Sequence, residues 1–248
     1  MKKTITKVNF KEIVKKNLAP KITMGGNIKL GNTSTFGVWS TLKGNEYINI
    51  KKLNGSVQGT CGEYCKNCSK ECYVNHSYRY GSVLYRHALN ALWIKNDLHT
   101  TFYLLSKQLE RKKKPFDIIR INQSGELTSP EELQEWNNLA LKNPKTIFYV
   151  YTKNYNAVKE LIKMKKIAKN LTILISIWHD QGVKEYEEMK DCPNIKAFVY
   201  DDGVMNIKSD TQCMAYAGGK LNHNITCEKC KKCFDRNNSH KVISCKSH

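Results

Sequence analysis

The sequence predicts an α/β protein built around a parallel β-sheet. Apolar segments of strand length recur along the middle of the chain, and segments with the spacing of amphipathic helices separate them. The four predicted strands span residues 117–122, 146–152, 171–178 and 195–200. Strands that alternate with helices form either an open doubly wound sheet or a full or partial (β/α) barrel. The 248 residues suffice for one large domain of this class, with or without a small appendage.

The N-terminal part of the chain, residues 1–60, is rich in glycine and asparagine and predicts short strands and turns. A long helical stretch comes later and precedes the basic run at 111–114. Its apolar stripe consists of Leu98, Phe102, Leu105 and Leu109. Aromatic and basic residues are interleaved between residues 78 and 87. For the tyrosines among them we expect helix packing rather than stacking against a ligand.

The helix after the first predicted strand has a clear start signal. Ser129 is suited to the N-cap, Pro130 to the first turn, and Glu132 stands three residues after the cap. The buried face of this helix is predicted to consist of Leu133, Trp136 and Ala140. Further helices are predicted over 156–169 and 182–190. The strand 171–178 is apolar throughout, which predicts that both of its faces are covered.

The charge balance is strongly basic, with 41 Lys and Arg against 22 Asp and Glu, a net charge of +19. Such a field favours a polyanionic partner, most simply nucleic acid, although lysine-rich helix faces that bind nothing would give the same count. No segment has the roughly 18 apolar residues that a membrane helix needs, and the N-terminus lacks the features of a secretory signal. We therefore expect a cytoplasmic protein without a membrane partner; the sequence does not define its oligomeric state.

Eight of the ten cysteines form two groups whose spacing predicts metal centres rather than disulfides. The first group is Cys61, Cys65, Cys68 and Cys72, and the second is Cys213, Cys227, Cys230 and Cys233. Three cysteines at C-x2-C-x2-C spacing are typical of bacterial iron–sulfur sites, whereas a single zinc usually takes two pairs of ligands. The spacing favours iron–sulfur clusters over zinc. Cys192 and Cys245 stand alone and are not expected to be ligands.

Polar side chains follow each predicted strand. Ligands in both candidate architectures bind at the carboxyl ends of the strands, so these residues are candidates for a functional site. They are Gln123, Ser124, Gly125 and Glu126, then Thr152, Lys153 and Asn154, then His179 and Asp180, and finally Asp201 and Asp202. Loops are polar in any case, which accounts for part of the pattern.

The segments 61–73, 119–136, 148–154 and 227–234 resemble the phage gene product 88 family, whose members look like relatives of the radical SAM superfamily. The resemblance extends from about Gly26 to the end of the chain. It implies a protein of a phage or mobile element with a partial (β/α) barrel of radical SAM type and a cysteine-rich C-terminal extension. The implied units are residues 1–60, which lead into the barrel, 61–205 with the cluster loop and barrel, and 206–248 with an auxiliary metal site.

The resemblance assigns the first cluster in two ways. The gene product 88 pattern maps onto Cys61, Cys68 and Cys72, followed by Tyr73, whereas the C-x3-C-x2-C spacing of radical SAM enzymes maps onto Cys61, Cys65 and Cys68. The aromatic residue that usually precedes the last radical SAM cysteine is replaced by asparagine at position 67. Both mappings stay open, as does ligation by all four thiolates.

The same resemblance implies a cofactor site and an activity. Ser124, Gly125 and Glu126 stand where radical SAM barrels have a Gly-Gly-Glu type segment that receives the amino group of S-adenosylmethionine. The substrate-side candidates are Lys153, His179, Asp180 and Asp202. The implied protein carries one or two [4Fe–4S] clusters and acts as a radical S-adenosylmethionine enzyme of undefined substrate. The alternatives are a non-catalytic iron–sulfur or zinc protein that binds nucleic acid, and a structural zinc at the C-terminal group.

Overall fold

The architecture comes from a computed structural model that describes most of the chain. The described residues are 5–24, 28–38, 40, 47–62, 68, 72, 74–112, 116–178, 182–201, 207–215, 222, 224–235 and 237–245. Cys65, His179, Asp180 and Asp202 lie outside these residues.

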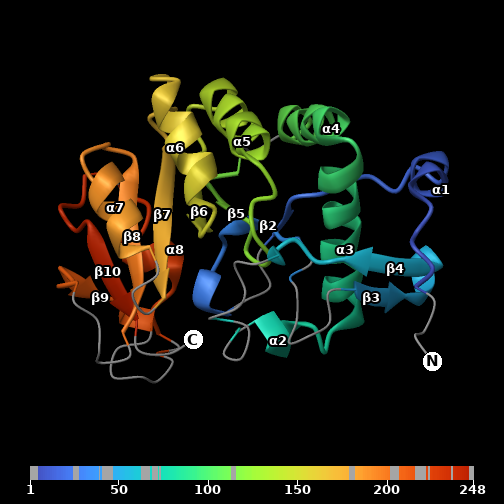
Figure 1. Ribbon diagram of the computed structural model, residues 1–248, viewed down its shortest axis with the longest axis horizontal. Coiled ribbons are helices and arrows are strands. Elements are labelled where there is room, and N and C mark those ends of the chain that lie inside the picture. The colour runs from blue at the N-terminus through green and yellow to red at the C-terminus, as the bar shows by residue number, and fades with distance from the viewer. Residues whose placement is uncertain are drawn as a thin grey trace.

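An eight-stranded sheet forms the centre of the molecule (Figure 1). Its order is β1 (Thr23–Met24), β2 (Ser34–Phe36), β5 (Ile118–Ile121), β6 (Ile147–Thr152), β7 (Leu171–Trp178), β8 (Ile195–Tyr200), β10 (Val242–Cys245) and β9 (Thr211–Gln212). β1 is antiparallel to β2, and every other neighbouring pair is parallel. Strands β3 (Tyr47–Ile50) and β4 (Gly55–Gln58) form a separate antiparallel hairpin.

Helices connect the parallel strands, as the alternating sequence pattern predicts. They are α1 (Phe10–Lys15), α2 (Val74–Ser77), α3 (Gly81–Asn96), α4 (Leu98–Glu110), α5 (Pro130–Lys142), α6 (Tyr155–Lys163), α7 (Val183–Met189) and α8 (Cys227–Cys230), with short 3-10 turns at Ile28–Leu30 and Lys51–Leu53. The expected long helix before the first central strand is divided into α3 and α4 at Asp97. The Asp97 side chain caps α4 by accepting a hydrogen bond from the Thr100 amide at 3.0 Å.

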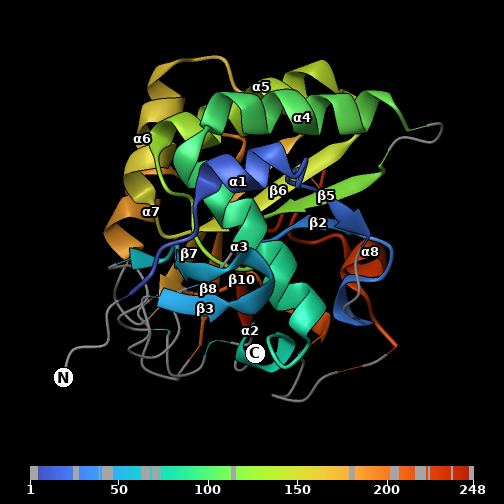
Figure 2. The same cartoon turned by 90° about the vertical axis from the view of Figure 1, so that its right-hand side faces the viewer.

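The two faces of the sheet are covered by different parts of the chain, because successive side chains of a strand point to opposite faces. On one face, Ile119, Val150 and Ile173 pack in a core with residues of α3 to α7. On the other face, Tyr149, Leu174 and Phe198 form a second cluster with Cys213, Phe234 and Cys245 of the C-terminal segment. Figure 2 shows α4, α5, α6 and α7 on one side of the sheet, with α8 apart from them. The C-terminal segment thus supplies β10, the edge strand β9 and the cover of the second face.

The sequence locates the four central strands well. The continuous apolar strand 171–178 is observed with these bounds and is buried along its whole length, as expected. Ser129 caps α5 by accepting a hydrogen bond from the Glu132 amide, and Leu133, Trp136 and Ala140 are buried. The helix predicted over 156–169 is shorter, because α6 ends at Lys163 and Lys165 adopts a positive φ of 54°.

The sheet is open among the described strands, with β1 and β9 at its two edges. The predicted α/β class with a mostly parallel sheet is therefore confirmed, whereas no described strand closes the sheet into a barrel. None of the described helices combines the length and the apolar character that crossing a lipid bilayer requires.

Candidate functional site at the carboxyl edge of the sheet

The carboxyl ends of the parallel strands meet at the lower edge of the sheet in Figure 1. This edge presents Ser124, Gly125 and Glu126 after β5 and Lys153 directly after β6. Trp178 and Tyr200 are the last residues of β7 and β8. The sequence-predicted candidates that the structure describes therefore share one edge, where ligands of open α/β sheets bind.

The loop after β5 has a conformation that depends on Gly125. Its φ is +78°, and a Cβ atom at this position would lie 2.4 Å from both the Thr60 Oγ1 and the Val38 Cγ2 atoms. Two hydrogen bonds hold Ser124, the residue before Gly125, against Val38. The Ser124 hydroxyl donates to the Val38 carbonyl at 2.8 Å, and the Val38 amide donates to the Ser124 carbonyl at 3.1 Å. The glycine is therefore needed both for the backbone conformation and for the close approach of Val38 and Thr60.

Tyr78 is a residue of this site for which the sequence predicts packing alone. Its hydroxyl forms a short hydrogen bond with the Ser124 hydroxyl and accepts from the Ser40 amide at 3.1 Å. Burial raises the pKa of Tyr78, so the phenol stays protonated. The packing interpretation is incomplete for this tyrosine, because its half-buried ring packs against the core while its hydroxyl is hydrogen-bonded to the Ser124 loop. Nothing in the local sequence distinguishes it from the neighbouring tyrosines.

Glu126 is almost fully buried and holds two loops together. Its carboxylate accepts hydrogen bonds from the Leu127 amide at 2.8 Å, the Thr152 hydroxyl at 2.6 Å and the Lys153 amide at 2.8 Å. Burial raises the pKa of Glu126, and the positive charge of Lys153 opposes this shift. The carboxylate thus ties the loop after β5 to the loop after β6.

The first cysteine group begins beside this loop. Thr60, the residue before Cys61, accepts a hydrogen bond from the Glu126 amide at 3.0 Å. The ammonium group of Lys153 donates to the Cys68 sulfur at 3.3 Å and lies 5.4 Å from the centre of the Trp178 ring. Trp178 in turn stacks on Tyr200 with ring centres 4.2 Å apart. The cysteine loop, the Ser-Gly-Glu segment and Lys153 are therefore in contact at one edge.

The second cysteine group lies on the sheet face opposite α3 to α7. Cys213, Cys227, Cys230 and Cys233 line one pocket together with Tyr149, Tyr151, Phe198 and Lys29. Burial raises the pKa of Cys227 and raises that of Cys233 to about 12, and a hydrogen bond with Tyr151 opposes the second shift. The positive charges of Lys29 and Arg120 favour the thiolate form of Cys227. The structure therefore brings all four predicted ligands to one pocket.

The donor set of this pocket suits a thiolate-bound metal. Four cysteines are the ligands of both structural zinc and [4Fe–4S] clusters, and no disulfide joins any two of the described cysteines. Among the described residues, however, no three His, Cys, Asp or Glu side chains stand close enough together to hold an ion as they are placed. Of the first group, Cys61, Cys68 and Cys72 are described and half-buried, whereas Cys65 lies outside the described residues.

A family model described as Gene product 88 matches residues 21–236. The chain belongs to the Gene product 88 family. No curated protein and no solved structure matches it. The family match covers the described cysteines of both groups and the whole carboxyl edge of the central strands, up to Tyr200 of β8.

Proposed function

We propose that this Gene product 88 family member is a phage or mobile-element iron–sulfur protein that binds S-adenosylmethionine on a radical-SAM-like partial barrel. The first cluster is assigned to Cys61, Cys65 and Cys68, with Cys72 as a fourth ligand or a neighbour. The second is assigned to Cys213, Cys227, Cys230 and Cys233. One observation carries the proposal, namely the contact of the cysteine loop with the Ser-Gly-Glu loop through Thr60 and Glu126.

The order of the elements supports this proposal. β2 is followed along the chain by the first cysteine group and then by α3 and α4, and β5 pairs in parallel with β2. Ser124, Gly125 and Glu126 follow β5 directly, downstream of the cysteine loop. This is the arrangement that the resemblance to radical SAM barrels implies for a cofactor loop.

The residues of the chain have distinct roles in this proposal. An iron–sulfur cluster supplies the electrons for cleaving S-adenosylmethionine, and the cofactor carries the radical chemistry. Glu126 is a positioning residue, because its carboxylate is engaged by three protein donors and holds the two loops together. Lys153 places a positive charge beside a cluster ligand. His179, Asp180 and Asp202 are proposed on the substrate side, as the sequence indicates.

Anaerobic purification followed by iron, sulfide and zinc analysis is the first test. We expect roughly four or eight irons per chain, for one or two [4Fe–4S] clusters, with absorption near 400 nm. Cys230→Ser should remove the iron of the C-terminal centre, whereas Cys192→Ser, outside both groups, should leave the iron content unchanged. Stoichiometric zinc with little iron would refute the iron–sulfur assignment and support a zinc-stabilised protein.

The cofactor is tested separately with the iron-loaded protein. With dithionite and S-adenosylmethionine, we expect formation of 5′-deoxyadenosine, detected by liquid chromatography. Cys61→Ala should abolish this product. A protein that contains iron but neither binds nor cleaves S-adenosylmethionine would favour the alternative, a non-catalytic iron–sulfur protein that binds nucleic acid.

A further inference from the structure

Three neighbouring loops at the amino edge of the sheet carry a row of cations. They join α4 to β5, α5 to β6 and α6 to β7. Six exposed basic side chains at these loops are here called the basic edge: Arg111, Lys112, Lys142, Lys145, Lys165 and Lys166. Lys169, shortly before β7, is also exposed. Because β5, β6 and β7 are adjacent parallel strands, their preceding loops lie side by side, at the upper edge of Figure 1 and opposite the cysteine loops.

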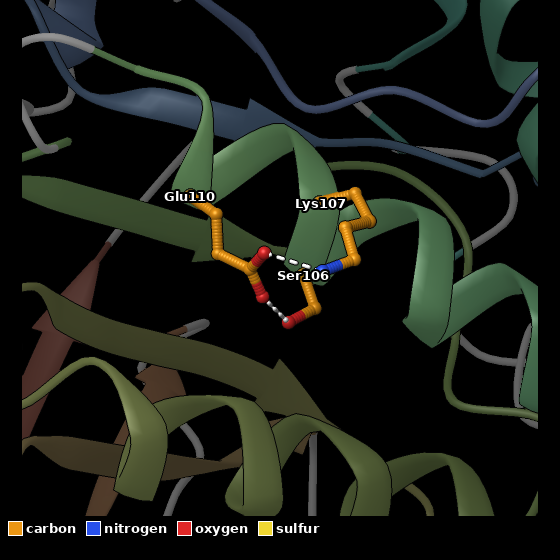
Figure 3. Close-up of polar contacts among 3 residues, drawn as sticks. All are labelled: Ser106, Lys107 and Glu110. Atoms are coloured by element: carbon orange, nitrogen blue, oxygen red, sulfur yellow. Dashed lines mark hydrogen bonds and ion pairs between the residues drawn. The ribbon is translucent and has the colours of Figure 1, made fainter.

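Acidic side chains offset this row only in part, through the electrostatic attraction between Glu110, at the end of α4, and Lys142. The sequences of the three loops contain a single acidic residue, Asp117. None of the six described cations forms an ion pair, whereas lysines on the adjoining helix surfaces do. Lys107 lies 2.7 Å from the Glu110 carboxylate, which also accepts from Ser106 (Figure 3), and Lys163 lies 2.7 Å from Glu160. The contrast separates the basic edge from an ordinary helix surface with internal charge pairing.

Helix stability explains only part of the row. The C-terminal ends of α4, α5 and α6 lie at this edge, and a cation in the last turn of a helix contributes about 0.3–1 kcal/mol. Lys145, Lys165 and Lys166 lie beyond the helix ends, where this effect has largely decayed. Lys165 has a φ of +54°, a conformation that disfavours side chains other than glycine by about 1–2 kcal/mol. Neither helix capping nor backbone preference accounts for a lysine there.

We propose that the basic edge binds the phosphate backbone of nucleic acid without regard to base sequence. Lysine ammonium groups act as point charges toward phosphate and do not have the planar fork that reads base edges. The three strands are spaced so that their loops span about 10 Å. This length matches about three phosphates of one strand, which recur roughly every 3.4 Å along the axis of a DNA duplex. The proposal does not depend on which metal the cysteines hold.

The full-length protein and a fluorescein-labelled 20-base-pair DNA duplex provide the main test, by fluorescence anisotropy across a series of KCl concentrations. The variant combines Lys142→Glu, Lys145→Glu, Lys165→Glu and Lys166→Glu. We expect binding at least 100-fold weaker at 100 mM salt, with the slope of log K against log salt smaller by roughly three to four. A measurement with one labelled strand of this duplex alone shows whether the basic edge prefers the backbone geometry of double-stranded or single-stranded DNA.

A control of equal charge change separates this site from diffuse attraction. It combines Lys11→Glu, Lys15→Glu, Lys16→Glu and Lys52→Glu, all exposed residues of the N-terminal part. The proposal predicts affinity within about threefold of the unmodified protein. Equal losses in the two variants would show that net charge alone attracts DNA, and would overturn the assignment of the surface. No binding to duplex or single strand at 50 mM salt would overturn the proposal altogether.

Lys165 allows a test that misfolding cannot imitate. Lys165→Gly removes one charge and relieves the left-handed backbone, so we expect a higher Tm together with roughly threefold weaker DNA binding. Lys165→Arg should keep the affinity. Binding that rises with Tm would contradict a phosphate contact.

Leu141 and Met164 are the exposed apolar residues beside the row. Their replacement by serine should leave DNA binding unchanged; binding only to phosphatidylserine vesicles, lost in that variant, would replace nucleic acid with a membrane.

Discussion

At the scale of single residues, two glycines show how conformation and packing contribute separately to the candidate site. Gly125 and Gly62 both have positive φ, but an added Cβ would be crowded only at Gly125. The sequence predicts a flexible glycine between Ser124 and Glu126. It could not predict the contacts with Thr60 and Val38, because these come from segments more than 60 residues away in the chain.

Gly125→Ala should therefore cost about 2–5 kcal/mol of folding stability, the sum of left-handed strain and overpacking. Gly62→Ala, where no atom of a described residue lies within 4 Å of the new Cβ, should cost only the strain, about 1–2 kcal/mol. Urea denaturation of the two variants measures the difference. Equal losses of stability would mean that Thr60 and Val38 move aside for the added methyl group without destabilising the protein.

His87 gives the protein a pH dependence at the residue scale. It is buried against Gly37 and Tyr78, and its Nδ1 atom has no hydrogen-bond partner among the described residues. Burial lowers its pKa from 6.5 to about 4. Between these values the unfolded chain binds the proton and the folded protein does not, so stability falls as the pH decreases.

We expect His87 to account for a loss of about 3 kcal/mol between pH 6.5 and pH 4. His87→Leu should remove that loss, and the difference between the two proteins isolates it. The comparison of the two proteins is needed because burial raises the pKa values of Glu126 and Glu132. These two carboxyl groups therefore increase the stability of the folded protein as the pH falls, opposite to His87. Parallel stability curves for the two proteins from pH 4 to pH 7 would rule His87 out as the source.

At the scale of elements, the sequence predicts best where local and tertiary signals agree. The strand 171–178 is apolar throughout and the α5 start has a complete cap, and both are observed as expected. α6 ends earlier than predicted because Lys165 turns left-handed, a conformation that the sequence favours mainly at glycine or asparagine. β9 and β10 escape prediction because they are short and acquire their hydrogen bonds only from distant β8 and from each other.

Lys196 of β8 attaches the C-terminal segment to the sheet. Its buried ammonium donates to the Lys232 and Asp235 carbonyls, each at 2.9 Å, on either side of Cys233. Lys196→Met should leave both carbonyls without this donor and cost about 3 kcal/mol locally. Hydrogen exchange should then accelerate in residues 231–238, while exposed Lys208→Met should cause no change. Unaltered exchange in the first variant would show that the thiol pocket alone holds the segment.

At the scale of the whole molecule, the sequence predicts the parallel α/β architecture and which cysteines are grouped. Cys213, Cys227, Cys230 and Cys233 line one pocket, while their ligation of a metal stays a prediction. The participation of β2 and β10 in the central sheet could not be predicted, because periodicity does not reveal which strands become neighbours. The same applies to Lys153 and Cys68, which meet across 85 residues of chain.

The net charge of +19 should make the stability of the molecule depend on salt. Self-repulsion opposes the compact state, and salt screens it over about 8–10 Å at physiological ionic strength. We expect Tm to rise by several degrees between 20 and 200 mM KCl. The quadruple variant of the basic edge, at +11 after four changes of −2, should gain less. A rise of the same size in both proteins would mean that specific ion binding, not repulsion, is responsible.

The parallel pairing of β9 with β10 has a consequence for maturation of the protein. Parallel neighbours need a crossover, so the segment 213–241 has to cross one face of the sheet between them, and it carries all four thiols of the C-terminal pocket. Because β9 joins the sheet through β10, all four thiols are on an untethered stretch of polypeptide until β10 docks. The four thiols are therefore held together for a metal ion or cluster only after β10 has joined the sheet.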